Sequence, residues 1–235
     1  MTRGLRTGIL GGTFDPIHVG HLAVAAAARR RLGLDRVWLT PAAVPPHRAA
    51  GPAASAYHRF AMVALACSDG DAFDPCDIEL DRPGPSYTAD TLRRLQASGP
   101  AAAGLFFLSG ADAFAEIATW RDYPAVLSLA NFVVTSRPGL EASGLPARLP
   151  ELAPRMHVLA DNGETPGDTP TPLIYLMDCP TPDVSSTGIR ARIREGRTIT
   201  GLVPPAVDDY IRRHGLYGAS PVSDGAAGPD GRPFA

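Results

Sequence analysis

The strongest constraint on the fold is an apolar run that ends in two glycines and leads into a long helix. Residues 8–10 form the run, Gly11 and Gly12 follow, and an alanine-rich segment predicts a helix that begins near residue 18 or 20 and ends at Leu32. Glycine permits a sharp turn and a close approach of a ligand to the main chain. The N–H groups and the dipole of a helix N-terminus favour a phosphate. The segment therefore predicts a strand, an anion-binding turn and a helix, in that order.

Two histidines stand where this helix begins. His18 and His21 are three residues apart, so they share one face of a helical first turn. Three other interpretations of the segment are weaker. The glycines alone could form an ordinary tight turn. A metal pair would need a third ligand at zinc-site spacing, and none is nearby. A dinucleotide fingerprint would need glycine where Thr13 and Pro16 stand.

The same alternation of short apolar runs and helical patterns continues along the chain. It predicts an α/β fold, a Rossmann-like three-layer sandwich around a central parallel sheet with right-handed crossovers. In such sheets a ligand binds at the carboxyl ends of the strands. The expected strands are residues 8–10, 36–40, 73–82, 105–108, 131–136, 156–160 and 173–177. The clearest helices are residues 22–32 and 57–67, a helix that begins after Ser86 or Thr88 and runs to about Ala97, and a helix that begins at Ser185 or Ser186.

Composition limits the classes of function. The chain has 235 residues and a net charge of −2, which gives no general attraction to nucleic acid or to an anionic membrane. Its three cysteines are odd in number and form no C-x-x-C pair, which favours a reducing compartment. No signal-peptide core and no membrane-spanning run is present in the sequence. We therefore expect a cytoplasmic protein with one domain at 1–217 and a disordered tail at 218–235.

An acidic stretch lies in the strand expected at residues 73–82. Asp77, Glu79 and Asp81 alternate, so on a strand they would share one face. Three carboxylates at that spacing could suggest a metal site. A solvated strand face is the simpler interpretation, and it is the one we adopt.

Three strings resemble a known family. The first, GGTFDPIHVGHL at residues 11–22, contains the H-x-G-H motif of the nucleotidyltransferase superfamily. The second, GPSYTADTL, begins at Gly84, and the third, VSSTGIR, begins at Val184. Together they resemble the bacterial nicotinate-nucleotide adenylyltransferases, and the likeness extends over residues 8–217. It implies adenylyl transfer from ATP to nicotinate mononucleotide in NAD biosynthesis, with pyrophosphate as the second product.

The resemblance also assigns roles to residues. It implies that the catalytic residues are His18, His21 and Arg190. The implied ATP site consists of Gly11, Gly12, Thr13, Phe14, His21, Ser186, Thr187 and Arg190. The implied site for the second substrate consists of Arg48, Tyr87, Thr88, Asp112, Trp120, Arg121 and Arg137. Mg²⁺ is expected to be bound mainly through the ATP phosphates and water, with few protein ligands.

Several of these positions have structural alternatives. Arg48 stands where the family carries a lysine-like residue; arginine can grip a phosphate bidentately, or it can be an exposed loop cation. Asp112 could simply cap a helix, as could Ser86 or Thr88. Ser185 or Ser186 should cap the helix that carries Arg190.

Two rival functions stay open at this stage. One is another transferase on the same scaffold, which would use nicotinamide mononucleotide, phosphopantetheine or a CTP-dependent alcohol phosphate. The other is a nucleotide-binding regulator without catalysis. The sequence leaves the oligomeric state open, a homo-oligomer included.

Overall fold

The computed structural model describes residues 4–45, 51–68, 70, 72–82, 84–99, 101–136, 140–159, 169 and 171–219. Its centre is a seven-stranded sheet in the order β3-β2-β1-β4-β5-β7-β6, and every pairing in it is parallel. The strands are β1 Thr7–Gly12, β2 Arg36–Pro41, β3 Phe73–Pro75, β4 Leu105–Gly110, β5 Asn131–Thr135, β6 Met156–Val158 and β7 Ile174–Met177.

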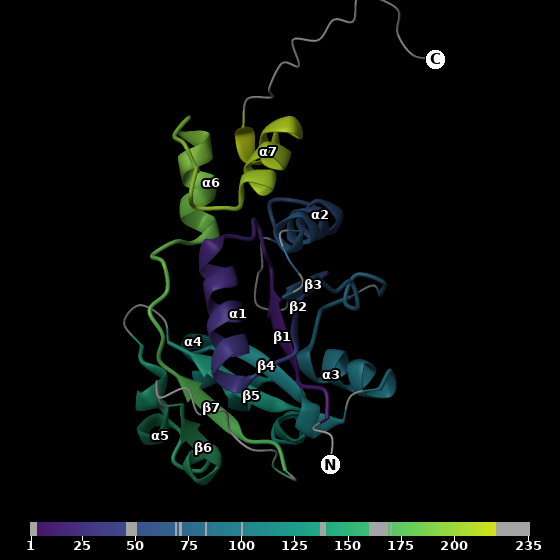
Figure 1. Ribbon diagram of the computed structural model, residues 1–235, viewed down its shortest axis with the longest axis vertical. Coiled ribbons are helices and arrows are strands. Elements are labelled where there is room, and N and C mark those ends of the chain that lie inside the picture. The colour runs from purple at the N-terminus through teal and green to yellow at the C-terminus, as the bar shows by residue number, and fades with distance from the viewer. Residues whose placement is uncertain are drawn as a thin grey trace, which may run out of the picture.

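Helices cover both faces of the sheet (Figure 1). The α-helices are α1 Val19–Leu32, α2 Ala56–Cys67, α3 Thr88–Ala97, α4 Ala111–Ala115, α5 Leu145–Arg148, α6 Ser186–Arg194 and α7 Pro205–Arg213. Short 3-10 turns are η1 Ala102–Gly104, η2 Ile117–Thr119, η3 Ala125–Ser128, η4 Ala142–Gly144, η5 Ala153–Arg155 and η6 Leu216–Gly218.

The two cores follow from the alternation of side chains along the buried strands. Leu10 and Phe106 point to one face, where they join the apolar residues of α1, α2, α6 and α7. Ile9 and Phe107 point to the other face, where they join α3, α4 and α5. A strand buried on both sides is mostly apolar, because neither face meets water. The three-layer α/β sandwich that the sequence predicts is therefore confirmed.

One expected strand is much shorter than the sequence suggests. β3 is an edge strand that ends at Pro75. The chain then turns, and the Leu80 N–H donates to the Asp77 carbonyl oxygen at 2.7 Å. The prediction that Asp77, Glu79 and Asp81 share a solvated strand face is therefore wrong. A turn breaks the alternation, so Asp77 and Asp81 are exposed whereas Glu79 is only partly exposed.

Some predictions lie outside the described residues. These are the positions of Arg48 and Arg137 and the tail from residue 220 onward. The predicted domain boundary at 217 falls within η6, which ends at Gly218. Within the residues that the structure describes, no helix has both the length and the apolar character needed to cross a bilayer.

Candidate active site

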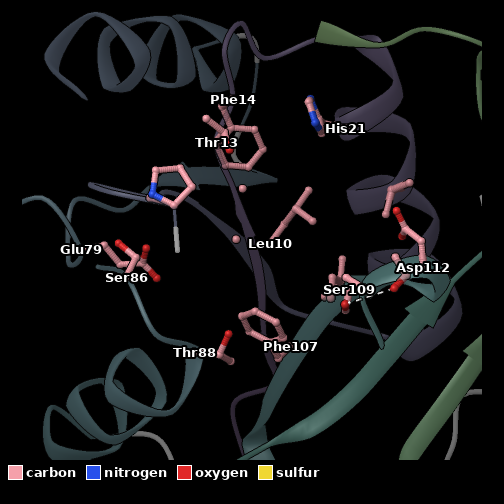
Figure 2. Close-up of a pocket in the computed structure, with 18 of the residues that line it drawn as sticks. Leu10, Thr13, Phe14, His21, Glu79, Ser86, Thr88, Phe107, Ser109 and Asp112 are labelled. Atoms are coloured by element: carbon pink, nitrogen blue, oxygen red, sulfur yellow. Dashed lines mark hydrogen bonds between the residues drawn. The ribbon is translucent and has the colours of Figure 1, made fainter. Parts of the chain in front are cut away.

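A cavity of about 480 Å³ opens at the carboxyl edge of the sheet (Figure 2). It lies over β1 and β4, where the strand order changes direction, and ligands of open parallel sheets bind at this point. Its floor is apolar, with Leu10 and Phe107 among the lining residues, and polar groups surround the floor (Figure 2). The remaining lining residues are Gly11, Gly12, Thr13, Phe14, Gly20, His21, Val24, Ala42, Pro45, Glu79, Ser86, Tyr87, Thr88, Leu108, Ser109, Gly110, Asp112, Ala113, Thr119, Trp120, Arg121, Thr135 and Ser186.

The turn between β1 and α1 is tightly packed. A Cβ on Gly12 would lie 3.1 Å from two ring carbons of Phe14, so glycine keeps this contact open. Phe14 is buried and has φ +49°, a left-handed conformation that a bulky side chain rarely adopts. Strained backbone of this kind persists where surrounding contacts determine it, and it gathers at functional sites. The ring of Phe14 meets His21 edge-on, with 5.0 Å between ring centroids.

The two histidines have different surroundings. His18 is the N-cap residue of α1 and is buried, and its ring stacks on that of His21 at 3.6 Å between centroids. The His18 N–H donates to Nδ1 of His21 at 3.2 Å. That bond makes Nδ1 an acceptor, so the proton of a neutral His21 is on Nε2. His21 lines the cavity, whereas His18 lies behind it.

Glycine in the H-x-G-H motif has a packing reason. A Cβ on Gly20 would lie 3.1 Å from Nδ1 of His18 and 3.1 Å from Cγ1 of Val184. Either contact is tighter than side chains normally allow, so a larger residue would push α1 away from the segment before α6. The glycine therefore brings the first and third motifs together.

The third motif supplies the N-terminus of α6. Ser185 is the N-cap, and its Oγ accepts the Gly188 N–H at 3.1 Å, which confirms the predicted serine cap. Ser186 has another role, because its Oγ donates to the Pro16 carbonyl oxygen at 2.9 Å. Arg190 follows on the same face and donates from Nη2 to Thr187 Oγ1 at 3.3 Å.

Buried charges hold this half of the cavity together. Arg190 donates from Nη1 to the carbonyl oxygen of Asp15 at 2.6 Å and lies 3.6 Å from the Asp15 carboxylate. Arg59 is fully buried and donates to the carbonyl oxygens of Thr13, Ala43 and Ala54 at 2.7, 3.1 and 3.3 Å. Sequence reasoning gave neither Asp15 nor Arg59 a role, because only the fold brings these loops together.

The opposite wall of the cavity is formed by the second motif. The Ser86 N–H donates to the Val44 carbonyl oxygen, and Ser86 Oγ accepts the Ala43 N–H at 3.0 Å. Neither Ser86 nor Thr88 caps α3; its N-cap is Tyr87, without a side-chain cap bond. Ser86 therefore connects the loop before α3 to the loop after β2 through hydrogen bonds.

Glu79 belongs to this wall and lines the cavity beside Ser86 (Figure 2). Its carboxylate accepts a hydrogen bond from Thr91 Oγ1 at 2.7 Å. Burial raises the pKa of Glu79, and hydrogen bonds from Thr91 and Ser86 and the charge of Arg94 oppose that rise in pKa. The sequence signal for this residue is weak, because an acidic residue in a polar stretch usually faces solvent.

The rim of this wall carries an aromatic pair and a cation. Trp120 packs edge-on against Phe107 at 6.1 Å and donates from Nε1 to the Ala113 carbonyl oxygen at 3.3 Å. The Arg121 guanidinium lies 4.7 Å above the ring of Tyr87, a cation–π contact. Exposed ion pairs that involve Asp90, Arg93 and Asp122 continue this surface.

Asp112 lies at the β4 end of the cavity (Figure 2). Gly110, not Asp112, is the N-cap of α4, so the alternative that Asp112 caps this helix is wrong. Ser109, which sequence reasoning left without a role, lines the cavity beside it. Asp112 is exposed in the first turn of α4.

The structure brings most of the predicted site residues to one cavity. Those that line it are Gly11, Gly12, Thr13, Phe14, His21, Tyr87, Thr88, Asp112, Trp120, Arg121 and Ser186. Those that lie behind or beside it are His18, Thr187 and Arg190. Arg48 and Arg137 cannot be placed, since both fall outside the described residues.

Known proteins match most of this chain. The cytidylyltransferase-like family matches residues 9–192. A probable nicotinate-nucleotide adenylyltransferase of Roseiflexus sp. (strain RS-1) is 46% identical over 210 residues, which cover 89% of this chain and 96% of the relative. One of Geobacter sulfurreducens is 41% identical over 213 residues, which cover 91% and 98%. The fold resembles the Plasmodium falciparum nicotinic acid mononucleotide adenylyltransferase complexed with NaAD, with a TM-score of 0.65 at 18% identity, covering 91% of this chain and 98% of that one.

The parallel sheet, the H-x-G-H turn and the cytidylyltransferase-like match define the class as a nucleotidyltransferase. Within that class, the chain belongs to the nicotinate-nucleotide adenylyltransferase family, because these two relatives are 46% and 41% identical to it over nearly their full length.

Proposed function

We propose that this protein transfers the adenylyl group of ATP to nicotinate mononucleotide, giving nicotinate adenine dinucleotide and pyrophosphate in NAD biosynthesis. A phosphate oxygen of the mononucleotide attacks the α-phosphorus of ATP. The bond from that phosphorus to the oxygen bridging the α- and β-phosphates breaks, and pyrophosphate leaves. The observation that carries the proposal is a single cavity with His21 and the α6 N-terminus at one end and the Tyr87–Trp120 wall at the other.

His21 is the group that we place at the reacting phosphate. Its Nδ1 accepts the His18 N–H, so its Nε2–H is the donor toward a phosphate oxygen. A donor that is already oriented stabilises charge that develops in the transition state without reorganising at the moment of reaction. His18 supports this role from behind, because its ring and its N–H both contact His21.

The ATP phosphates are proposed to lie along Gly11–Phe14 and the N-terminus of α6. N–H groups and helix dipoles attract anions there. Ser186, Thr187 and Arg190 add hydroxyls and a cation from the third motif, and Arg190 is already fixed near Asp15. Such a reaction demands alignment of two polyanions rather than covalent chemistry by the protein.

The acceptor is proposed to lie between Tyr87–Thr88 and Trp120. An indole face suits a flat pyridine ring, and the N-terminus of α3 suits its carboxylate. Arg121 adds positive charge at this rim, above Tyr87. These features favour the acid over the neutral amide. Arg48 and Arg137 remain predictions for the same substrate.

Mg²⁺ is proposed to accompany ATP, where it would neutralise phosphate charge. Mg²⁺ keeps several waters and prefers phosphates with one or two carboxylates to an all-protein site. Among the residues that the structure describes, no cluster of three His, Cys, Asp or Glu side chains could hold a metal.

Pyrophosphate release with ATP and Mg²⁺ tests the proposal, with nicotinate mononucleotide compared to nicotinamide mononucleotide. We expect kcat/KM to favour the acid strongly. Equal or better use of the amide would overturn the acceptor assignment while leaving the chemistry in place. Absence of release with either substrate would point to phosphopantetheine as the acceptor, and then to a regulator that only binds nucleotides.

A further inference from the structure

The last described turn of the chain reaches back to the phosphate end of the cavity. Tyr217 lies in η6, and its hydroxyl donates to Asp15 Oδ1 at 2.9 Å across 202 residues of sequence. Tyr217 has φ +61°, a left-handed conformation that costs energy for a residue with a side chain. Burial and the Asp15 charge raise the pKa of Tyr217, so its hydroxyl stays protonated and can donate.

Asp15 is almost completely buried and is surrounded by donors from several segments. Ala53 N–H donates to Oδ2 at 2.7 Å, and Ala54 N–H donates to Oδ1 at 3.1 Å. Tyr217 shares Oδ1 with Ala54. Arg190 reaches only the edge of this carboxylate, with 3.6 Å between Nη1 and Oδ2.

These contacts determine how strongly Asp15 holds Arg190. An arginine guanidinium and a carboxylate with no other hydrogen-bond donors often form a close, bidentate pair. In this structure the Oδ1 atom is occupied by Tyr217 and Ala54, so the pair stays long and one-sided. Loss of the Tyr217 hydroxyl would leave Oδ1 with the Ala54 N–H but without its second donor, and would let Arg190 turn toward Asp15, away from the phosphates that it is proposed to bind.

We propose that Tyr217 is a positioning residue that keeps Arg190 available for ATP by occupying the Asp15 carboxylate. This inference rests on the proposed placement of the ATP phosphates at Arg190 and not on the identity of the acceptor, because ATP binding can be measured without the acceptor. The phenol acts through Asp15 and Arg190, and it does not itself contact the substrate.

Tyr217→Phe removes the hydroxyl and keeps the ring. The matched control is Tyr210→Phe in α7, which removes a hydroxyl that bonds to His58 Nδ1 at 3.0 Å on the same C-terminal unit. Calorimetric titration with ATP and Mg²⁺, without acceptor, gives Kd for each variant. We expect about a tenfold weaker Kd for Tyr217→Phe, the lower end of the range for a hydrogen bond to a charged group, and a near wild-type Kd for Tyr210→Phe.

Three further readouts separate positioning from general destabilisation. KM for ATP should rise in Tyr217→Phe while KM for the mononucleotide stays constant, and thermal unfolding should shift similarly in the two variants. In an Arg190→Ala background, Tyr217→Phe should cause little further loss of ATP affinity, because Tyr217 affects ATP binding only through Arg190. The inference is wrong if Tyr217→Phe binds ATP as well as Tyr210→Phe, or if its effect persists undiminished without Arg190. A wild-type protein that binds ATP but releases no pyrophosphate would instead overturn the proposed function alone.

Discussion

The two ends of the cavity are built from the same kinds of residues in opposite environments. At the phosphate end the charges are buried: Arg59 is 0% exposed, Asp15 is 1% exposed, and both bind main-chain groups of neighbouring loops. At the acceptor end the charged side chains apart from Glu79 are at the surface, where Arg93, Arg121 and Asp122 form ion pairs with half-exposed side chains.

The difference indicates how each end can respond to a ligand. Buried charges keep strong, directional contacts, and removing one partner leaves another unsatisfied. Exposed pairs are screened by water and contribute little. The phosphate end should therefore be rigid and intolerant of change, as a site for transition-state charge requires. The acceptor end should tolerate change and allow its specificity to be tuned.

The largest effect should come from Arg59→Met, which removes a buried cation and keeps the length of the side chain. Three carbonyl groups would lose their donor, and we expect the free energy of unfolding to fall by about 3–5 kcal/mol. Denaturant unfolding measures this. The control is Arg36→Met, because Arg36 is half-exposed and lies 3.7 Å from Asp74; it should cost at most about 1 kcal/mol. Equal losses in the two variants would contradict the contrast between the ends.

His21→Ala should leave the fold intact and reduce turnover. We expect kcat to fall by about 10²- to 10³-fold, the cost of one oriented donor to developing charge. Stability should drop by only about 1 kcal/mol, since one hydrogen bond at the start of α1 is lost. His157→Ala, which removes an exposed imidazole from β6, is the control. Near-normal turnover by His21→Ala would remove this residue from the mechanism.

Glu79→Gln should change how stability depends on pH. The pKa of Glu79 is raised in the folded protein, so the folded state holds this proton more tightly than the unfolded state. Wild-type stability should therefore fall relative to Glu79→Gln as pH rises above the ordinary value of 4.5 and through the raised pKa. Unfolding experiments across this acid range measure the gap. Asp77→Asn controls for loss of one charge at an exposed site, and a gap of the opposite sign would refute the burial argument.

The smallest effect is expected for Asp122→Asn at the acceptor rim. Asp122 Oδ2 lies 2.6 Å from Arg93 Nη1, and both side chains are more than a third exposed. Asn tolerates the left-handed conformation at this position (φ +62°), so the substitution removes only the charge. We expect a loss of at most about 1 kcal/mol that shrinks in high salt. A salt-independent loss as large as that of Arg59→Met would show that the acceptor end is not the adaptable one.

The sequence by itself determined the layers of the fold and the identity of the three motifs. Buried parallel strands read as mostly apolar runs, and glycines and serines mark the turns and caps, so these signals are local. The serine cap of α6 and the pairing of Arg190 with Thr187 are also local, because residues at helical spacing share a face.

Only the tertiary structure decided which polar residues are buried and what they hold. The sequence indicated a solvated face for Glu79, but the chain turns after Pro75 and carries Glu79 to the cavity. Arg59 and Tyr217 show no local signal, since their partners Thr13 and Asp15 lie 46 and 202 residues away. Such long-range contacts depend on how separate loops pack together at the edge of the sheet. The hydrophobic periodicity of a single segment does not predict that packing.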